Sequence, residues 1–223
     1  MRMRLRTNAA DRLKACGDLV IQTYDDNRNV NDVLKERAYL DLTSLYRRNA
    51  PLYLEIGCGQ GGFICKTAVM HPENDYLAVE KIGNVLLTGA ENAFNENIGN
   101  LRFMRAKAEC LTKYIPPHSV SGVYLNFSTP LPRQGYAKQR LTAPRFLDIY
   151  RELLVPGGFV SQKTDDRAFF EFSAEQFENN GFIITEKTDN LHKDGEKGVV
   201  TEYERKFIAL NKPIYALKAI IKE

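Results

Sequence analysis

The sequence of 223 residues lacks the signals of a membrane protein or a metalloprotein. No apolar run is long enough to span a bilayer, and the basic first residues are not followed by the apolar core of a signal peptide. The four cysteines show no CxxC spacing, and together with three scattered histidines they do not form a zinc-binding pattern. We therefore expect a cytoplasmic protein with reduced cysteines, no bound metal and no membrane contact.

The composition is otherwise ordinary, with 43% hydrophobic and 26% charged residues. The length suits one domain that buries a full core, and the net charge of +3 permits a polyanionic partner without requiring one. Positive residues gather around the single acid Asp11 at the start: Arg2, Arg4, Arg6, Arg12 and Lys14. Such a terminus can contact RNA phosphates or simply be solvated. We expect a basic arm and leading helix over 1–50, followed by one domain over 51–223.

Short apolar segments alternate with helical periodicity along residues 51–223, which predicts a parallel sheet covered by helices. Expected strands are 52–56, 75–80, 101–104, 120–127, 159–163, 182–186 and 215–221. Expected helices are 32–48, 62–70, 85–95, 110–115, 143–154 and 168–179. The segment 203–210 meets the last strand without an intervening helix, so we expect that strand to be antiparallel. The sequence therefore predicts an α/β fold with a doubly wound, mostly parallel seven-stranded sheet, helices on both faces and an antiparallel last strand.

The most informative stretch is the glycine-rich turn after the first expected strand. Gly57, Gly59 and Gly61 allow positive φ angles and close backbone approach, so a flat ligand can lie across the turn. No G-K-[ST] follows, which excludes Walker-type phosphate binding. Glu55 lies in the strand before the turn, and Glu80 ends the second strand, where an acid can accept hydrogen bonds from ribose hydroxyls. These residues predict an adenosine-type ligand, although Glu80 can instead be an acid at the N-terminus of the next helix.

Later motifs carry a resemblance to a known family. They are Tyr124-Leu125-Asn126-Phe127-Ser128-Thr129-Pro130-Leu131-Pro132-Arg133, Arg140-Leu141, Lys163-Thr164-Asp165 and Thr201-Glu202-Tyr203-Glu204. With the glycine turn, they make nearly the whole chain closely similar to the bacterial tRNA (guanine-N7-)-methyltransferases. The resemblance implies a Rossmann-like methyltransferase fold, S-adenosyl-L-methionine as cofactor, and methylation of guanine N7 in the variable loop of tRNA.

The resemblance also implies roles for individual residues. The implied cofactor-binding residues are Glu55, Gly57, Gly59, Gly61, Glu80, Lys107, Ala108, Glu109, Asn126 and Thr129. The implied tRNA-binding residues are Arg133, Lys138, Arg140, Asp165, Thr201, Tyr203 and Glu204. The implied catalytic residues are Thr129, Asp165 and Glu204. Guanine N7 has a free lone pair, so placement matters more than a strong base, and carboxylates can select guanine and stabilise the charge that methylation creates.

Two departures from the family pattern bear on activity. The family signature N-F-S-D-P-W-P-K here has Thr129 for its aspartate, Leu131 for its tryptophan and Arg133 for its lysine. Lys107 stands where the family has an acid against the adenine amine, although Ala108 and Glu109 can still contact the cofactor. We therefore expect weakened rather than absent activity. The alternative is a diverged tRNA-binding paralogue with little or no activity; methylation of a small molecule or of another RNA position is less favoured.

The implied substrate residues also have structural interpretations. Asp165 and Asp166 can cap the helix that starts near Ala168, and Glu204 can lie on a solvated strand edge. The basic residues between 133 and 151 can form an exposed helix face instead of an RNA-binding surface. The sequence is compatible with a monomer or a homodimer.

Overall fold

The computed structural model describes residues 8–23 and 28–222, so Arg2, Arg4 and Arg6 lie outside the described residues. The chain divides into two compact units, Met1–Tyr114 and Ile115–Glu223. This division falls inside the segment 51–223 that we expect to be one domain. The described residues form eight strands, four in each unit. The sequence predicts seven, so one strand was missed.

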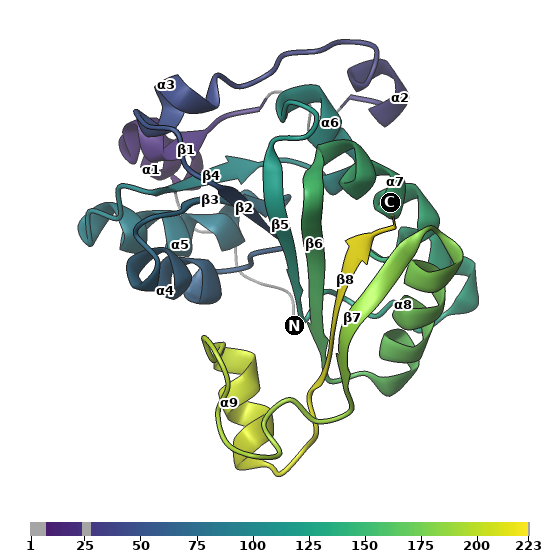
Figure 1. Cartoon of the computed structure of the whole chain (residues 1–223). Helices are drawn as coiled ribbons and strands as arrows, with labels where there is room; N and C mark the ends of the chain where they lie inside the picture. The colour runs from purple at the N-terminus through teal and green to yellow at the C-terminus, as the bar shows by residue number, and fades with distance from the viewer. Residues whose placement is uncertain (1–7, 24–27, 223) are drawn as a thin grey trace. The chain divides into compact units, whose positions relative to one another are not determined.

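The four strands of the first unit are parallel. They are β1 (Val20–Ile21), β2 (Leu52–Ile56), β3 (Asp75–Glu80) and β4 (Leu101–Arg105), in the spatial order β1-β4-β3-β2 (Figure 1). Glu55 lies opposite Ala78 and Ile56 opposite Val79, so β2 and β3 end at the same edge. The expected strands 52–56, 75–80 and 101–104 are confirmed. The strand missing from the prediction is β1, because two residues are too few to show an alternating pattern.

Helices of the first unit pack against β3 and β4. α4 (Gly62–Met70) packs on both strands, and so does α5 (Gly83–Asn95) (Figure 1). The other helical segments are α1 (Ala9–Ala15), η1 (Gly17–Leu19), α2 (Val30–Val33), α3 (Leu42–Tyr46), η2 (Ala108–Cys110) and α6 (Leu111–Tyr114). The expected helices over 62–70 and 85–95 are therefore confirmed.

The helix α1 is a packed part of the first unit. α1 packs on α5, and the Nε and Nη2 groups of Arg12 each donate to a carboxylate oxygen of Glu91 at 2.7 Å. A guanidinium that donates to both oxygens of one carboxylate forms a bidentate ion pair. Arg12 therefore fastens α1 to α5.

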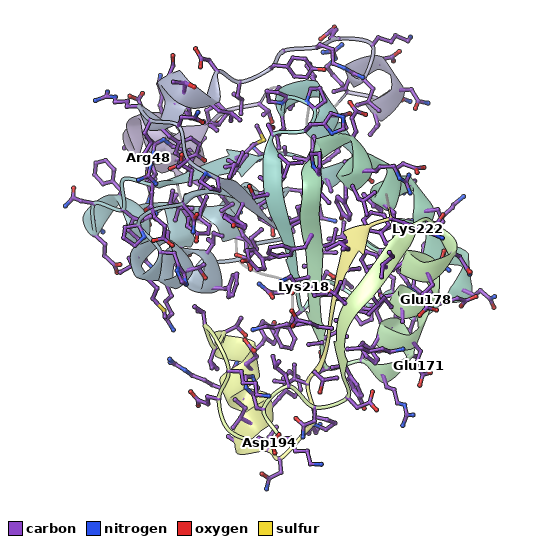
Figure 2. The ribbon with its side chains drawn as sticks, in the orientation of Figure 1. Arg48, Glu171, Glu178, Asp194, Lys218 and Lys222 are labelled. Carbon is purple, nitrogen blue, oxygen red and sulfur yellow. The ribbon has the colours of Figure 1, made fainter. Side chains whose placement is uncertain are left out.

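The expected continuous helix over 32–48 is wrong. Between α2 and α3, the Ala38 N–H donates to the carbonyl of Lys113 at 2.9 Å, and the Leu40 N–H donates to that of Tyr114 at 2.8 Å. These long-range bonds take backbone groups that a helix would bond to itself. After α3, the Arg48 side chain, labelled in Figure 2, reaches Asp75 at the start of β3 with Nε···Oδ1 2.8 Å. The segment is thus shaped by tertiary hydrogen bonds rather than by its apolar periodicity.

The second unit contains parallel and antiparallel pairs. Its strands are β5 (Val120–Asn126), β6 (Leu154–Thr164), β7 (Phe182–Thr188) and β8 (Tyr215–Ile221), in the spatial order β5-β6-β8-β7. β5 and β6 are parallel, whereas β8 is antiparallel to both β6 and β7. The prediction of an antiparallel last strand is confirmed. Asn126 lies opposite Lys163, so β5 and β6 end side by side.

The helices of the second unit are η3 (Gln134–Gln139), α7 (Pro144–Leu153), α8 (Arg167–Asn179) and α9 (Glu202–Ala209). α7 and α8 pack on β6, and α8 also packs on β7 and β8; its residues Glu171 and Glu178 lie on the outer side (Figure 2). The segment 203–210 lies within and just after α9, so an interpretation of Glu204 as a strand-edge residue is wrong. α9 and the loop before it, which contains Asp194, lie beyond the end of β7 from which the chain leaves that strand (Figures 1 and 2).

Candidate functional site

The glycine turn closes tightly against the end of β3. The N–H groups of Gly57 and Cys58 both donate to the carbonyl of Val79, at 2.8 and 3.1 Å. Gly57, Gly59 and Gly61 have φ angles of 77°, 58° and 75°, which residues with a Cβ rarely adopt. The predicted positive φ angles are therefore confirmed, and the turn places its backbone at the edge where β2 and β3 end.

One end of the turn is packed and the other is open. A Cβ at Gly61 would lie 3.1 Å from the Cα of Gly89 and from the Phe103 ring, so this end is held against α5 and β4. A Cβ at Gly57 or Gly59 would meet no atom within 4 Å. The open end leaves room for a ligand to approach the backbone closely.

The carboxylate of Glu80 lies beside this open end. One oxygen accepts from the Gly59 N–H at 3.3 Å, and the other accepts from the Ile82 N–H at 2.9 Å. Ile82 is the N-cap residue of α5, so Glu80 is also the acid near a helix start that the sequence allowed as an alternative. A carboxylate has about four lone-pair sites, so two remain for ligand hydroxyls.

The other implied cofactor residues of the first unit lie in β2 and in the segment that follows β4. Glu55 is buried in β2. Burial, with the nearby Glu55 and Glu80 carboxylates, raises the pKa of the Cys58 thiol, which therefore stays protonated at neutral pH. Lys107 is half-buried and precedes η2, which contains Ala108 and Glu109.

In the second unit, the loop after β5 carries several predicted site residues. The backbone turns at Phe127, which has φ 49° and whose N–H donates to the Lys163 carbonyl at 2.8 Å. Asn126, the last residue of β5, precedes this turn, and Thr129 is exposed two residues after it. The basic residues Arg133 and Lys138 are exposed, whereas Arg140 is half-buried.

The two aspartates after β6 have different environments. Asp166 is the N-cap of α8 and accepts from the Phe169 N–H at 2.7 Å. Asp165 is exposed and makes no hydrogen bond or ion pair with the described residues. The capping interpretation therefore holds for Asp166, and the carboxylate of Asp165 remains available to a ligand.

Thr201 and Glu204 form a reciprocal cap at the start of α9. The Thr201 hydroxyl accepts from the Glu204 N–H at 3.0 Å, and the Glu204 carboxylate accepts from the Thr201 N–H at 2.6 Å. The Glu204 side chain is fully buried, and its other oxygen lies 2.8 Å from Lys163 Nζ and 3.0 Å from His192 Nε2. Burial raises the pKa of Glu204. The charge of Lys163 and the hydrogen bonds from Lys163, Thr201 and His192 together outweigh burial, so the pKa lies below its ordinary value of 4.5.

His192 joins this cluster although the sequence did not point to it. Its Nδ1 accepts from the Lys197 N–H at 3.2 Å, so Nε2 carries the hydrogen that is donated to Glu204. His192 thereby connects the loop before α9 to the start of that helix. A lone histidine in a polar loop gives no sequence signal for such a contact.

Aromatic rings connect α9 to the end of β5. The Phe127 ring stacks on Tyr203 with centroids 5.7 Å apart and on Phe207 with centroids 6.1 Å apart. Tyr203 is nevertheless 59% exposed, and Lys206 Nζ lies 5.4 Å from its ring centroid. An exposed aromatic ring with a nearby cation is an arrangement that suits a nucleic-acid base.

Two kinds of feature are not found in the described residues. None of their helices is long and apolar enough to cross a membrane. Among the same residues, no group of three or more His, Cys, Asp or Glu side chains is placed to hold a metal ion.

Comparisons with known proteins show which family the sequence resembles. The sequence model of a family described as "Putative methyltransferase" matches residues 49–217. Three proteins, each named tRNA (guanine-N(7)-)-methyltransferase, are similar over most of their length. The one from Lachnoclostridium phytofermentans is 38% identical over 78% of this chain and 83% of its own. The one from Listeria monocytogenes serotype 4a is 34% identical over 98% of this chain and 98% of its own. The one from Bacillus subtilis is 33% identical over 96% of this chain and 96% of its own.

Solved structures show the same fold at low identity. A 16S rRNA methyltransferase, KamB, has a TM-score of 0.63 at 16% identity, with 84% of this chain and 96% of that chain covered. A SAM-dependent methyltransferase from Aquifex aeolicus has a TM-score of 0.54 at 10% identity, covering 97% and 100%. The predicted α/β fold of the Rossmann-like methyltransferase type is therefore confirmed.

Proposed function

Because the chain belongs to the tRNA (guanine-N(7)-)-methyltransferase family, we propose that it transfers a methyl group from S-adenosyl-L-methionine to guanine N7 in the variable loop of tRNA. The observation that carries the cofactor assignment is the open glycine turn beside Glu80. A backbone without Cβ atoms and a carboxylate with two free lone-pair sites fit the adenosine part of this cofactor.

The residues of the first unit would hold the cofactor. Glu80 would accept from the ribose hydroxyls, and the backbone of Gly57 and Gly59 would lie against the ligand. S-adenosyl-L-methionine supplies an electrophilic methyl group on a cationic sulfonium. The acid Glu55 favours a cation near the turn, and Lys107 can donate to an adenine nitrogen but cannot accept from the amine.

The remaining implied cofactor contacts complete this assignment. They are Gly61, Ala108, Glu109, Asn126 and Thr129. Gly61 contributes through packing, because its Cβ position is already filled by α5 and β4. Thr129 keeps a hydroxyl that can donate or accept, but no negative charge.

The residues of the second unit would bind the acceptor. The Asp165 carboxylate would accept from N1–H and the exocyclic amine of guanine, which selects guanine and stabilises the positive charge formed at N7. Tyr203 would stack on a base, and Thr201 would lie beside it at the start of α9. We assign Glu204 a supporting role, because its carboxylate is buried against Lys163, His192 and the Thr201 N–H.

The tRNA backbone would be bound by exposed basic residues. Arg133 precedes η3 and Lys138 lies in its last turn; both are exposed, so their charges can meet phosphates. Phosphate contacts of this kind supply affinity that falls steeply with salt. Tyr136 lies between them and is 46% exposed, which adds an aromatic surface for an unstacked base.

The proposal is tested by methylation of unmodified tRNA. The purified protein, incubated with S-adenosyl-L-methionine and tRNA, is expected to produce 7-methylguanosine that mass spectrometry of the nucleosides detects. Thr129→Asp restores the carboxylate of the family signature, and we expect it to raise kcat by roughly tenfold. A protein that binds tRNA but yields no 7-methylguanosine, even as Thr129→Asp, would support a non-catalytic paralogue instead.

The Glu80→Gln variant is expected to weaken cofactor binding by roughly 10- to 100-fold, about the effect of losing charge-assisted hydrogen bonds. Glutamine offers one acceptor oxygen, while its amide would face one of the two N–H groups that Glu80 now accepts from. Isothermal titration with S-adenosyl-L-methionine measures the change. Glu91→Gln is the matched control, because it removes only the exposed contact with Arg12 and is expected to bind as the wild type does. Wild-type affinity in Glu80→Gln would remove Glu80 from the site.

A further inference from the structure

The loop 128–133 has few means of holding its own shape. It connects β5 to η3, and none of its residues belongs to a helix or a strand. Pro130 and Pro132 have no N–H to donate. Leu131 adopts a φ angle of 47°, a left-handed conformation that is costly for a branched side chain. A loop of this kind needs an external contact to keep one conformation.

Arg140 supplies that contact. Its Nε donates to the Pro130 carbonyl at 2.8 Å, and its Nη2 donates to the Leu131 carbonyl at 3.2 Å. Its guanidinium carbon lies 4.3 Å from the centroid of the Phe172 ring on α8, and 5.9 Å from that of Phe169. The planar guanidinium thus donates two hydrogen bonds to successive carbonyls and lies against an aromatic ring. A lysine has one compact charge and cannot make both contacts.

We propose that Arg140 is a positioning residue that holds the loop 128–133 against α8 in the conformation required for methyl transfer. Thr129 and Arg133 lie on either side of the two bonded carbonyls, and both are exposed. Loss of the clamp would displace both residues while leaving their side chains intact. This role rests on the proposed function, and it replaces direct phosphate binding, the role that the family resemblance implied for Arg140.

Kinetics of Arg140→Lys distinguish the two roles, because lysine keeps the charge and loses the fork. For the positioning role, we expect kcat to fall roughly 10-fold or more, since small misplacements are costly in methyl transfer. The KM for tRNA should stay within about twofold, and its dependence on salt should be unchanged. A phosphate contact would instead tolerate lysine, and Arg140→Ala would lower the salt slope by about one. That second pattern would overturn the proposal.

Arg133→Ala provides the comparison for a residue that does meet phosphate. It should raise the KM for tRNA and reduce the salt slope by about one. Added methylguanidinium should restore part of the lost kcat of Arg140→Ala, because the small cation can occupy the place beside the two carbonyls and the Phe172 ring. It should not restore Arg133→Ala. Equal responses of the two variants would contradict separate roles.

Hydrogen exchange tests whether Arg140 holds the loop 128–133, and the test does not depend on enzyme activity. The N–H groups of residues 128, 129, 131 and 133 should exchange roughly tenfold faster in Arg140→Lys than in the wild type, while those of β6 should be unchanged. Wild-type exchange rates in this loop would overturn the proposal even if activity fell. If the wild type forms no 7-methylguanosine, the proposed function fails, and the exchange experiment still decides whether Arg140 holds the loop.

Discussion

Asp165→Asn is expected to lower kcat/KM for tRNA methylation by roughly 100- to 1,000-fold while the fold stays intact. The carboxylate of Asp165 is exposed and makes no hydrogen bond or ion pair with the described residues, so its charge is not needed for folding. In the proposed complex it accepts from N1–H and the exocyclic amine of guanine. Asparagine would turn an N–H group toward those donors and would remove the charge that offsets the methylated purine.

Asp166→Asn is the matched control for this change. Asp166 caps α8 through the Phe169 N–H, and asparagine caps helices about as well as aspartate. Activity and thermal stability should therefore both stay near those of the wild type. Steady-state kinetics with 7-methylguanosine as the readout, and thermal unfolding of both variants, make the comparison. Loss of activity in Asp166→Asn but not in Asp165→Asn would transfer the role to the neighbouring residue.

The expected Asp165→Asn defect should appear mainly in kcat rather than in tRNA affinity. Phosphate contacts dominate the affinity of proteins for nucleic acids, and one base contact adds little to them. The dissociation constant for tRNA should thus change by less than about threefold. A large loss of tRNA binding with an unchanged kcat would contradict a role at the reacting base.

The sequence was most reliable where a chemical requirement fixes the local backbone. The glycine turn needs positive φ at Gly57, Gly59 and Gly61, and all three have it. Glu80 lies beside the turn, as predicted, because adjacent parallel strands end at one edge of a sheet. By contrast, the apolar periodicity of 32–48 predicts one helix, which the structure does not have. Backbone hydrogen bonds from Ala38 to Lys113 and from Leu40 to Tyr114 interrupt the helical pattern.

The sequence around Glu204 contains a helix-start signal that the predicted elements do not include. Thr201-x-x-Glu204 has the spacing of a capping box, and it begins α9 in the structure. Recognition of that spacing predicts a helix at this point. The partners Lys163 and His192 could not be found in the same way, because they lie 41 and 12 residues away along the chain. Arg140 is similar, since its basic charge suggests RNA and only its carbonyl partners reveal another role.

Glu204→Ala is expected to lower the free energy of unfolding by about 3–5 kcal/mol, the cost of breaking a buried ion pair by removing one member. Lys163 is 14% exposed and would lose the carboxylate, while the Thr201 N–H and His192 would lose their acceptor. Chemical denaturation followed by circular dichroism measures the change. Glu171→Ala, which removes an exposed contact with Arg167 on α8, should leave the stability nearly unchanged. Equal effects of the two changes would mean that the buried cluster contributes little.

The pH dependence of Glu204→Gln separates the charge from the cap, because glutamine also completes a capping box. Burial raises the pKa of Glu204, but Lys163 and the hydrogen bonds bring it below the ordinary value of 4.5. A group with a lowered pKa in the folded state stabilises the protein above its unfolded pKa, and that contribution disappears as the pH falls through the folded value. The stability difference between the wild type and Glu204→Gln should therefore be constant from pH 7 to about 5 and should shrink below 4.5. A difference that grows on acidification would mean that the carboxylate is less acidic in the fold, and Lys163 would then not be its dominant partner.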